Sequence, residues 1–116
     1  MPEIVKSSCD KKEYKYLTLE NKIRAILISD AEADMAAASV DVHVGCSLDP
    51  KPLYGVAHFL EHMLFQGTEK YPKENEYAEF IKNNGGYNNA FTSLTDTNYH
   101  FECSNDAFEE ALDRLS

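Results

Sequence analysis

The sequence predicts an α+β domain, in which helices pack on a mainly antiparallel or mixed β-sheet. Two strand-like runs, Glu13–Glu20 and Ile23–Ser29, are separated by two polar residues, which is the spacing of a β-hairpin. Residues 38–44 alternate between apolar and polar side chains, as a half-buried strand does. Two helical patterns, two more strands and a last helical pattern follow. This order of elements describes a layered α+β fold.

The second run of the hairpin is apolar at nearly every position from 23 to 28. We therefore expect a strand that is covered on both faces. Residues 1–12 are polar and are expected to form a flexible tail, so that the domain occupies residues 13–116.

In the third strand, Val40, Val42 and Val44 lie on one face, whereas Asp41 and His43 lie on the other. His43 therefore belongs to the polar face. We interpret it as a solvated or hydrogen-bonded histidine, and a role as a metal ligand is the alternative.

A nearly continuous apolar segment over residues 53–65 is predicted to be a helix, and it contains His58, Glu61 and His62. At about 100° per residue, these three side chains share one face of the helix. Because the rest of the helix is apolar almost all round, we expect the helix to be buried, so that its polar side chains need partners.

Two imidazoles one helical turn apart can hold a zinc ion, and a carboxylate beside them can take a proton from water. The five residues from His58 to His62 have the H-x-x-E-H spacing in which metallopeptidases use that chemistry. The five letters alone also fit an ordinary helix, with two core histidines bonded to backbone carbonyls and Glu61 at a surface edge.

The other elements follow from local start and stop signals. Residues 47–52, with two prolines, are expected to form a loop, and Ser104 is expected to cap the last helix. Thr92 is expected to be exposed on an unusually polar strand. The remaining predicted elements are the helix Glu74–Asn84, the strands Tyr87–Ser93 and Thr97–Cys103, and a final helix with the apolar stripe Ala107, Phe108, Ala111, Leu112 and Leu115.

Composition limits the classes of partner. The chain has 116 residues and a net charge of −9, which argues against a nucleic-acid surface and against adhesion to an anionic membrane. Its three cysteines form no C-x-x-C pair, and no run of residues is long and apolar enough for a membrane span. The N-terminus has no pattern of a signal or transit peptide, so we expect a cytoplasmic protein. The oligomeric state is not indicated.

The segment 55–72, which includes the H-x-x-E-H motif, closely resembles the insulysin branch of the pitrilysin-type zinc metallopeptidases. The likeness extends from about Tyr16 to Leu115. Further matching segments are Glu74-Asn75-Glu76-Tyr77, Asn89-Ala90-Phe91-Thr92-Ser93, Thr97-Asn98-Tyr99, Asp41-Val42-His43-Val44-Gly45 and Ala111-Leu112-Asp113-Arg114. The resemblance implies a two-layer α/β sandwich of the pitrilysin and processing-peptidase type.

The resemblance also implies functional roles. His58 and His62 would be ligands of Zn²⁺, and Glu61 would be the general base of a metalloendopeptidase acting on small peptides and protein fragments. Asn89, Ala90 and Phe91 would lie on a strand edge where an extended peptide substrate pairs as an added strand. The polarity of this edge has a second explanation, since polar edges also prevent aggregation.

The third zinc ligand of such peptidases is a glutamate whose position would fall after Ser116. The resemblance therefore implies an N-terminal fragment of a catalytic domain, with the remaining domains of a longer polypeptide as partners. Alone, the 116-residue chain is expected to bind zinc weakly and to be inactive. The alternatives are a non-catalytic peptide-binding or scaffolding member of the same fold, and an incomplete product that aggregates through Phe108, Leu112 and Leu115.

Overall fold

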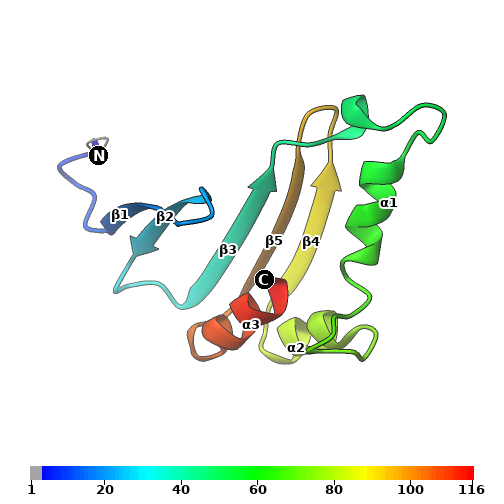
Figure 1. Cartoon of the computed structure of the whole chain (residues 1–116). Helices are drawn as coiled ribbons and strands as arrows, with labels where there is room; N and C mark the ends of the chain where they lie inside the picture. Colours follow the sequence, from blue (N-terminus) through cyan, green and yellow to red (C-terminus); the bar gives the residue numbers. More distant parts are fainter. Residues whose placement is uncertain (1–3) are drawn as a thin grey trace. The chain divides into compact units, whose positions relative to one another are not determined.

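The computed structural model describes residues 4–116, which divide into two compact units, one up to Ala33 and one from Asp34 to Ser116 (Figure 1). In the first unit, β1 (Glu13–Thr18) and β2 (Arg24–Ser29) pair in antiparallel register. The predicted hairpin is confirmed, although its connection runs from residue 19 to residue 23 and includes Lys22 with a φ of 73°. Part of the predicted tail, residues 1–3, lies outside the described residues.

The expectation that the second strand is covered on both faces is wrong. Ile26, Leu27 and Ile28 are 61%, 51% and 60% exposed. Within residues 4–116, β2 pairs with β1 alone, and the two strands form a sheet of their own. A two-stranded ribbon without a packed layer cannot bury two faces, however apolar its sequence is.

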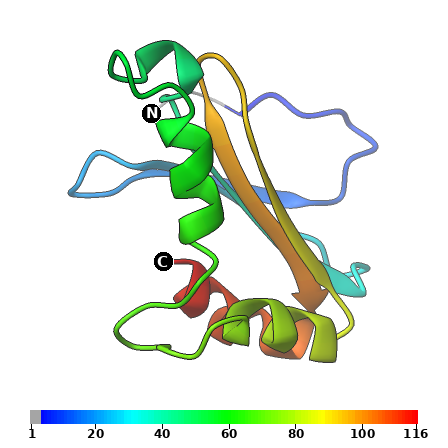
Figure 2. The ribbon, with the colours of Figure 1, turned by 90° about the vertical axis from the view of Figure 1, so that its right-hand side faces the viewer.

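The second unit contains a three-stranded antiparallel sheet of β3 (Met35–Val42), β4 (Tyr87–Thr92) and β5 (Thr97–Ser104) in the order β3-β5-β4. The helices α1 (Val56–Met63), α2 (Glu76–Asn83) and α3 (Phe108–Leu115) all lie on one side of this sheet, which Figure 2 shows nearly edge-on. The unit therefore has one helical layer and one sheet layer, and the predicted α+β class is confirmed.

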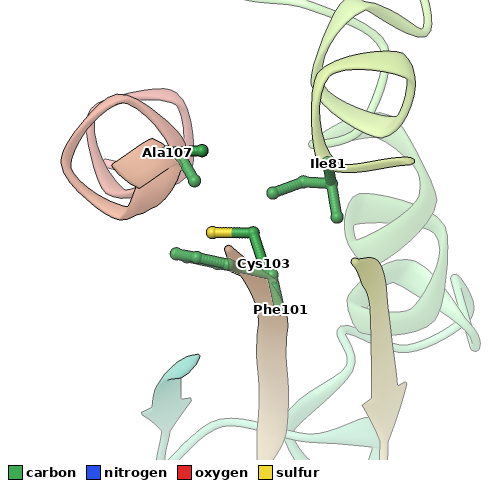
Figure 3. Close-up of a cluster of buried hydrophobic side chains, with 5 residues drawn as sticks. Ile81, Phe101, Cys103 and Ala107 are labelled. Carbon is green, nitrogen blue, oxygen red and sulfur yellow. The ribbon is translucent and has the colours of Figure 1, made fainter. Parts of the chain in front are cut away.

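The core of this unit lies where α2 and α3 pack against the central strand β5 (Figure 3). Phe101 and Cys103 of β5 are 2% and 0% exposed, and Ile81 of α2 is 0% exposed. Burial raises the pKa of the Cys103 thiol. The side chains that complete this cluster, or pack against it, are Ala107, Ala111, Ala38, Tyr77, Phe80, Phe108 and Leu115.

Element boundaries differ from the prediction by a few residues, and one predicted cap is absent. Ser104 lies at the N-terminal cap of a 3-10 turn, Asn105–Ala107, that precedes α3, but its side chain makes no capping hydrogen bond. The tight turn shifts the start of the α-helix to Phe108. Among residues 4–116, a helix with the length and apolarity needed to cross a membrane does not occur.

Candidate metal centre

The helix that carries the candidate ligands is fixed at its N-terminus by Asp49. The backbone N–H groups of Gly55 and Ala57 donate to the two carboxylate oxygens of Asp49, at 2.6 and 3.0 Å. A negative side chain at this end also matches the helix dipole. The sequence predicted only a loop here, because a capping residue six positions before the N-cap Gly55, across two prolines, has no local pattern.

The loop that carries Asp49 is itself bound to the turn between β4 and β5. The N–H groups of Cys46 and Ser47 donate to the carbonyls of Ser93 and Leu94, each at 2.9 Å. Gly45 permits this approach, since a Cβ at its position would lie 2.5 Å from the Ser93 carbonyl oxygen. The start of α1 is therefore held in a defined place relative to the end of β4.

His58 and His62 face each other on successive turns of α1. Their Nε2 atoms are 3.0 Å apart, and their rings stack with centroids 4.8 Å apart and planes inclined by 23°. One ligand atom from each of His58, Glu61 and His62 lies within 4.8 Å of the others. The helical spacing thus brings together the three side chains that the sequence singled out.

This geometry fits a zinc ion. Two nitrogens at about 2.0–2.1 Å from a tetrahedral zinc are roughly 3.3 Å apart, close to the separation found here. His58 and His62 would hold such a metal through Nε2, as two of the three protein ligands that a catalytic zinc needs.

Glu61 has a different environment from the two histidines. It is 6% exposed, whereas both imidazoles are exposed. Thr92 Oγ1, at the end of β4, donates to Glu61 Oε2 at 2.5 Å. The negative charge of Glu61 also reaches Tyr99 on β5, whose pKa is raised mainly by burial and further by this charge. The carboxylate is therefore seated between the helix and the sheet.

The contact of Thr92 with Glu61 was not predicted from the sequence. The sequence suggested an exposed residue on a polar strand, but Thr92 is half-buried and reaches across to Glu61. The signal that could have found it is the strand alternation, which places Asn88, Ala90 and Thr92 on the more covered face of β4.

The prediction that α1 is buried all round is wrong for this chain. Phe59, Leu60 and Leu64 are 67%, 53% and 55% exposed. Only the face that carries Glu61 contacts the sheet, since a single sheet layer covers one side of a helix. The apolar pattern predicted the position of the helix correctly, but it did not predict which layers surround the helix.

The three residues expected to bind substrate lie on β4, an edge strand of the sheet in residues 34–116. Asn89 and Phe91 are exposed and alternate with the half-buried Ala90. The Ala90 N–H donates to the side-chain oxygen of Asn89 at 2.9 Å. An added strand that pairs with this N–H would have to displace the Asn89 amide.

His43 is confirmed as a hydrogen-bonded, solvated histidine. Its side chain is 86% exposed, and Nδ1 lies 2.6 Å from Asp96 Oδ1 in the turn between β4 and β5. The hydrogen bond from His43 is the main cause of the lowered pKa of Asp96, and the same bond raises the pKa of His43.

A groove of about 300 Å³ lies elsewhere in the second unit, and none of the three motif side chains lines it. Its walls include Val40, Tyr77, Tyr99 and Arg114. Two buried atoms, Tyr77 Oη and Arg114 Nε, have no hydrogen-bond partner within the described residues. Burial raises the pKa of Tyr77.

The H-x-x-E-H motif on α1, whose three side chains lie together, is the motif of the inverzincin class of metallopeptidases. Comparison with known proteins also indicates a peptidase family. The chain belongs to the insulinase family, peptidase family M16, whose model matches residues 24–116.

Several relatives of this chain are insulin-degrading enzymes. The chain is 53% identical to insulin-degrading enzyme-like 2 of Arabidopsis thaliana over 98% of its own length and 12% of that protein. It is 52% identical to the insulin-degrading enzyme of Mus musculus, again over 98% of its length and 11% of that protein. The chain thus spans about one eighth of the length of these relatives.

The crystal structure of pitrilysin has the same fold. It superposes with a TM-score of 0.93 at 39% identity, and the match covers 97% of this chain and 12% of that one. The predicted pitrilysin-type, two-layer fold and the resemblance to the insulysin branch are both confirmed.

Proposed function

We propose that this chain is the N-terminal part of a zinc-dependent metalloendopeptidase that hydrolyses peptide bonds in small peptides and protein fragments. The observation that carries the proposal is the pair of opposed Nε2 atoms, 3.0 Å apart, beside the buried carboxylate of Glu61. Membership of peptidase family M16 supports the reaction class.

In this proposal the three motif residues of α1 have two different roles, metal binding and proton transfer. His58 and His62 bind the metal as neutral imidazoles. A bound zinc ion would supply Lewis-acid polarisation of water and of the scissile carbonyl. Glu61 accepts the proton of the attacking water and later delivers it to the departing amine, as a general base and then a general acid. Glu61 is suited to this role because it is fixed beside the imidazoles and does not need to bind the metal.

We propose that a residue outside this chain supplies the third protein ligand of the zinc. Two imidazoles leave a catalytic zinc one protein ligand short. The resemblance implies a glutamate from a later part of a longer polypeptide, and the small share of the relatives' length covered by this chain supports that reading. The partners proposed are accordingly peptide substrates and the remaining domains of that polypeptide.

Substrate binding is proposed for Asn89, Ala90 and Phe91 at the edge of β4. An extended peptide would add to the sheet there through main-chain hydrogen bonds. The exposed side chains of Asn89 and Phe91 support this role. We also retain the cytoplasm as the proposed location, which fluorescence microscopy of the tagged full-length protein would check.

The test is Glu61→Gln in the full-length polypeptide. The amide preserves the size of the side chain but cannot take a proton, so turnover of a quenched peptide should fall by about 10²–10⁴-fold. Zinc content should remain that of the wild type. The matched control is Glu79→Gln on α2, which removes an exposed carboxylate paired with Lys73 and should leave turnover unchanged.

Retained turnover in Glu61→Gln would exclude the proposed mechanism. A wild-type protein that binds peptides but never cleaves them would favour the alternative, a peptide-binding or scaffolding member of this fold.

A further inference from the structure

Glu61 is the one buried charged side chain among residues 4–116. A buried carboxylate needs hydrogen-bond donors, because the water it loses must be replaced. The donor that the structure supplies is Thr92 Oγ1, at 2.5 Å from Oε2. This hydrogen bond replaces one of those to water that the carboxylate loses on burial.

The backbone that carries the Thr92 hydroxyl is held by strand pairing and by a hydrogen-bonded turn. Thr92 is the last residue of β4 and pairs with Thr97 of β5. The next residue closes the turn, since Ser93 N–H donates to the Asp96 carbonyl at 2.8 Å. A threonine side chain is also stiff about χ1 because it is branched at Cβ. Thr92 can therefore hold one carboxylate oxygen in a fixed position.

The same turn also fixes the start of α1. It binds the loop of Cys46 and Ser47, and that loop carries Asp49, which caps the helix. The backbone that places the two imidazoles and the hydroxyl that places the carboxylate are thus tied to one turn. Rotation of Glu61 away from the imidazoles would break its bond to Thr92 in a half-buried setting.

We propose that Thr92 is a positioning residue for the general base: its hydroxyl holds Glu61 Oε2 so that the other carboxylate oxygen is aimed at the water beside His58 and His62. This inference rests on the proposed function and adds to it a residue on another element. Thr92 touches neither metal nor substrate in this role, so its loss should affect the rate and not metal binding.

The experiment uses five variants of the full-length polypeptide. Thr92→Val keeps the shape and removes the hydroxyl, and kcat should fall about tenfold or more, as expected for a lost hydrogen bond to a charged group. KM and zinc content should stay within about twofold of the wild type. Thr92→Ser should restore kcat and Thr92→Ala should not, and this pair carries the same test if the valine variant does not fold.

Thr97→Val is the matched control. Thr97 is 5% exposed and is the β5 residue that pairs with Thr92. Its hydroxyl donates to the Val44 carbonyl at 2.8 Å. Its loss should lower the melting temperature without lowering kcat. If Thr92→Val and Thr97→Val reduce kcat equally, or if Thr92→Ala turns over as fast as Thr92→Ser, the positioning role is wrong.

Glu61→Gln separates the two proposals. If the wild type cleaves, Glu61→Gln does not, and Thr92→Val equals the wild type, only the inference about Thr92 is overturned. If Glu61→Gln cleaves like the wild type, the proposed function fails and the inference fails with it.

Discussion

The Nε2 atoms of His58 and His62 lie 3.0 Å apart on successive turns of α1. Two imidazolium rings could not share this arrangement, because both nitrogens would present protons to each other. Two neutral rings fit it, either with one ring nitrogen donating to the other or with both nitrogens directed at a bound cation. The relationship therefore leads directly to a prediction about metal binding by the chain itself.

The 116-residue chain should bind zinc weakly and should not cleave peptides, because two imidazoles provide only part of a catalytic site. His58→Ala or His62→Ala should weaken binding at least about tenfold, since loss of a direct ligand costs no less than loss of an outer-shell partner. Competitive zinc titration measures this. The control is His43→Ala, whose imidazole is bonded to Asp96 and not to the motif. Zinc held against a mild chelator, together with peptide cleavage, would contradict the prediction.

Two adjacent glycines should differ in their tolerance of alanine. Gly85 has a φ of 73° and open space at its Cβ position, so Gly85→Ala should cost about 1–2 kcal/mol of backbone strain. A Cβ at Gly86 would lie 1.8 Å from the Glu102 carbonyl oxygen, which belongs to β5. Gly86→Ala must displace a strand of the core and should cost more than about 3 kcal/mol.

Urea unfolding of the chain, followed by circular dichroism, gives both values. Each glycine serves as the control for the other, because the same methyl group is added at neighbouring positions. Equal losses of stability would show that the close contact between Gly86 and β5 does not exist in solution.

Local features of the fold and site could be predicted from the sequence. The motif residues share one face because helical periodicity depends only on spacing within one segment. The Thr92 bond to Glu61 could not be predicted in this way, because it joins residues 31 positions apart and depends on how β4 meets α1. The exposure of Phe59 and Leu60 was missed for a related reason: burial depends on the layers around a helix and not on its own sequence.

The pair of His43 and Asp96 should make stability depend on pH. The pKa of His43 is raised above its ordinary value of 6.5, so its contribution is present below that value and is lost as pH rises through the folded pKa. The pKa of Asp96 is lowered from 3.8, so its contribution is present above that value and is lost as pH falls through the folded pKa. The pair therefore contributes in the window between these two ordinary values.

NMR titration of the His43 imidazole should give a midpoint above 6.5, and Asp96→Asn should lower it. Asp41→Asn is the graded control, because Asp41 raises the same pKa less than Asp96 does. An unchanged midpoint in Asp96→Asn would rule out the hydrogen bond as the cause.

Arg114 should stabilise the contact between α3 and α2 by the shape of its side chain as well as by its charge. Its guanidinium carbon lies 4.4 and 3.9 Å from the ring centroids of Tyr71 and Phe80, and the side chain is 12% exposed. It also pairs with Glu76 at 3.5 Å. Arg114→Lys keeps the charge but loses the planar stacking, and we expect a loss of about 1 kcal/mol; Arg114→Ala should lose about 2 kcal/mol.

Thermal unfolding of the two variants would measure these losses. Lys73→Ala is the control, because its partner Glu79 is exposed and such pairs contribute about 0–1 kcal/mol. If lysine replaces Arg114 without loss, stacking on the two rings does not contribute.

The apolar outer face of α1 should make the isolated chain self-associate. Phe59, Leu60, Met63 and Leu64 are 67%, 53%, 48% and 55% exposed, and they adjoin one another at helical spacings. Contiguous apolar patches of this kind associate, whereas single exposed apolar residues are ordinary. The sequence had suggested the final helix instead, but Phe108 and Leu115 pack against the core and only Leu112, at 40% exposure, remains open.

The double variant Phe59→Gln, Leu60→Gln should raise several-fold the concentration at which light scattering detects oligomers. The control removes two exposed apolar residues that do not share a helix, Val5→Gln and Leu94→Gln, at 91% and 71% exposure. This control should change association little, because neither residue belongs to the α1 face. Equal effects of the two double variants would mean that total exposed apolar area drives association, and not the surface of the motif helix.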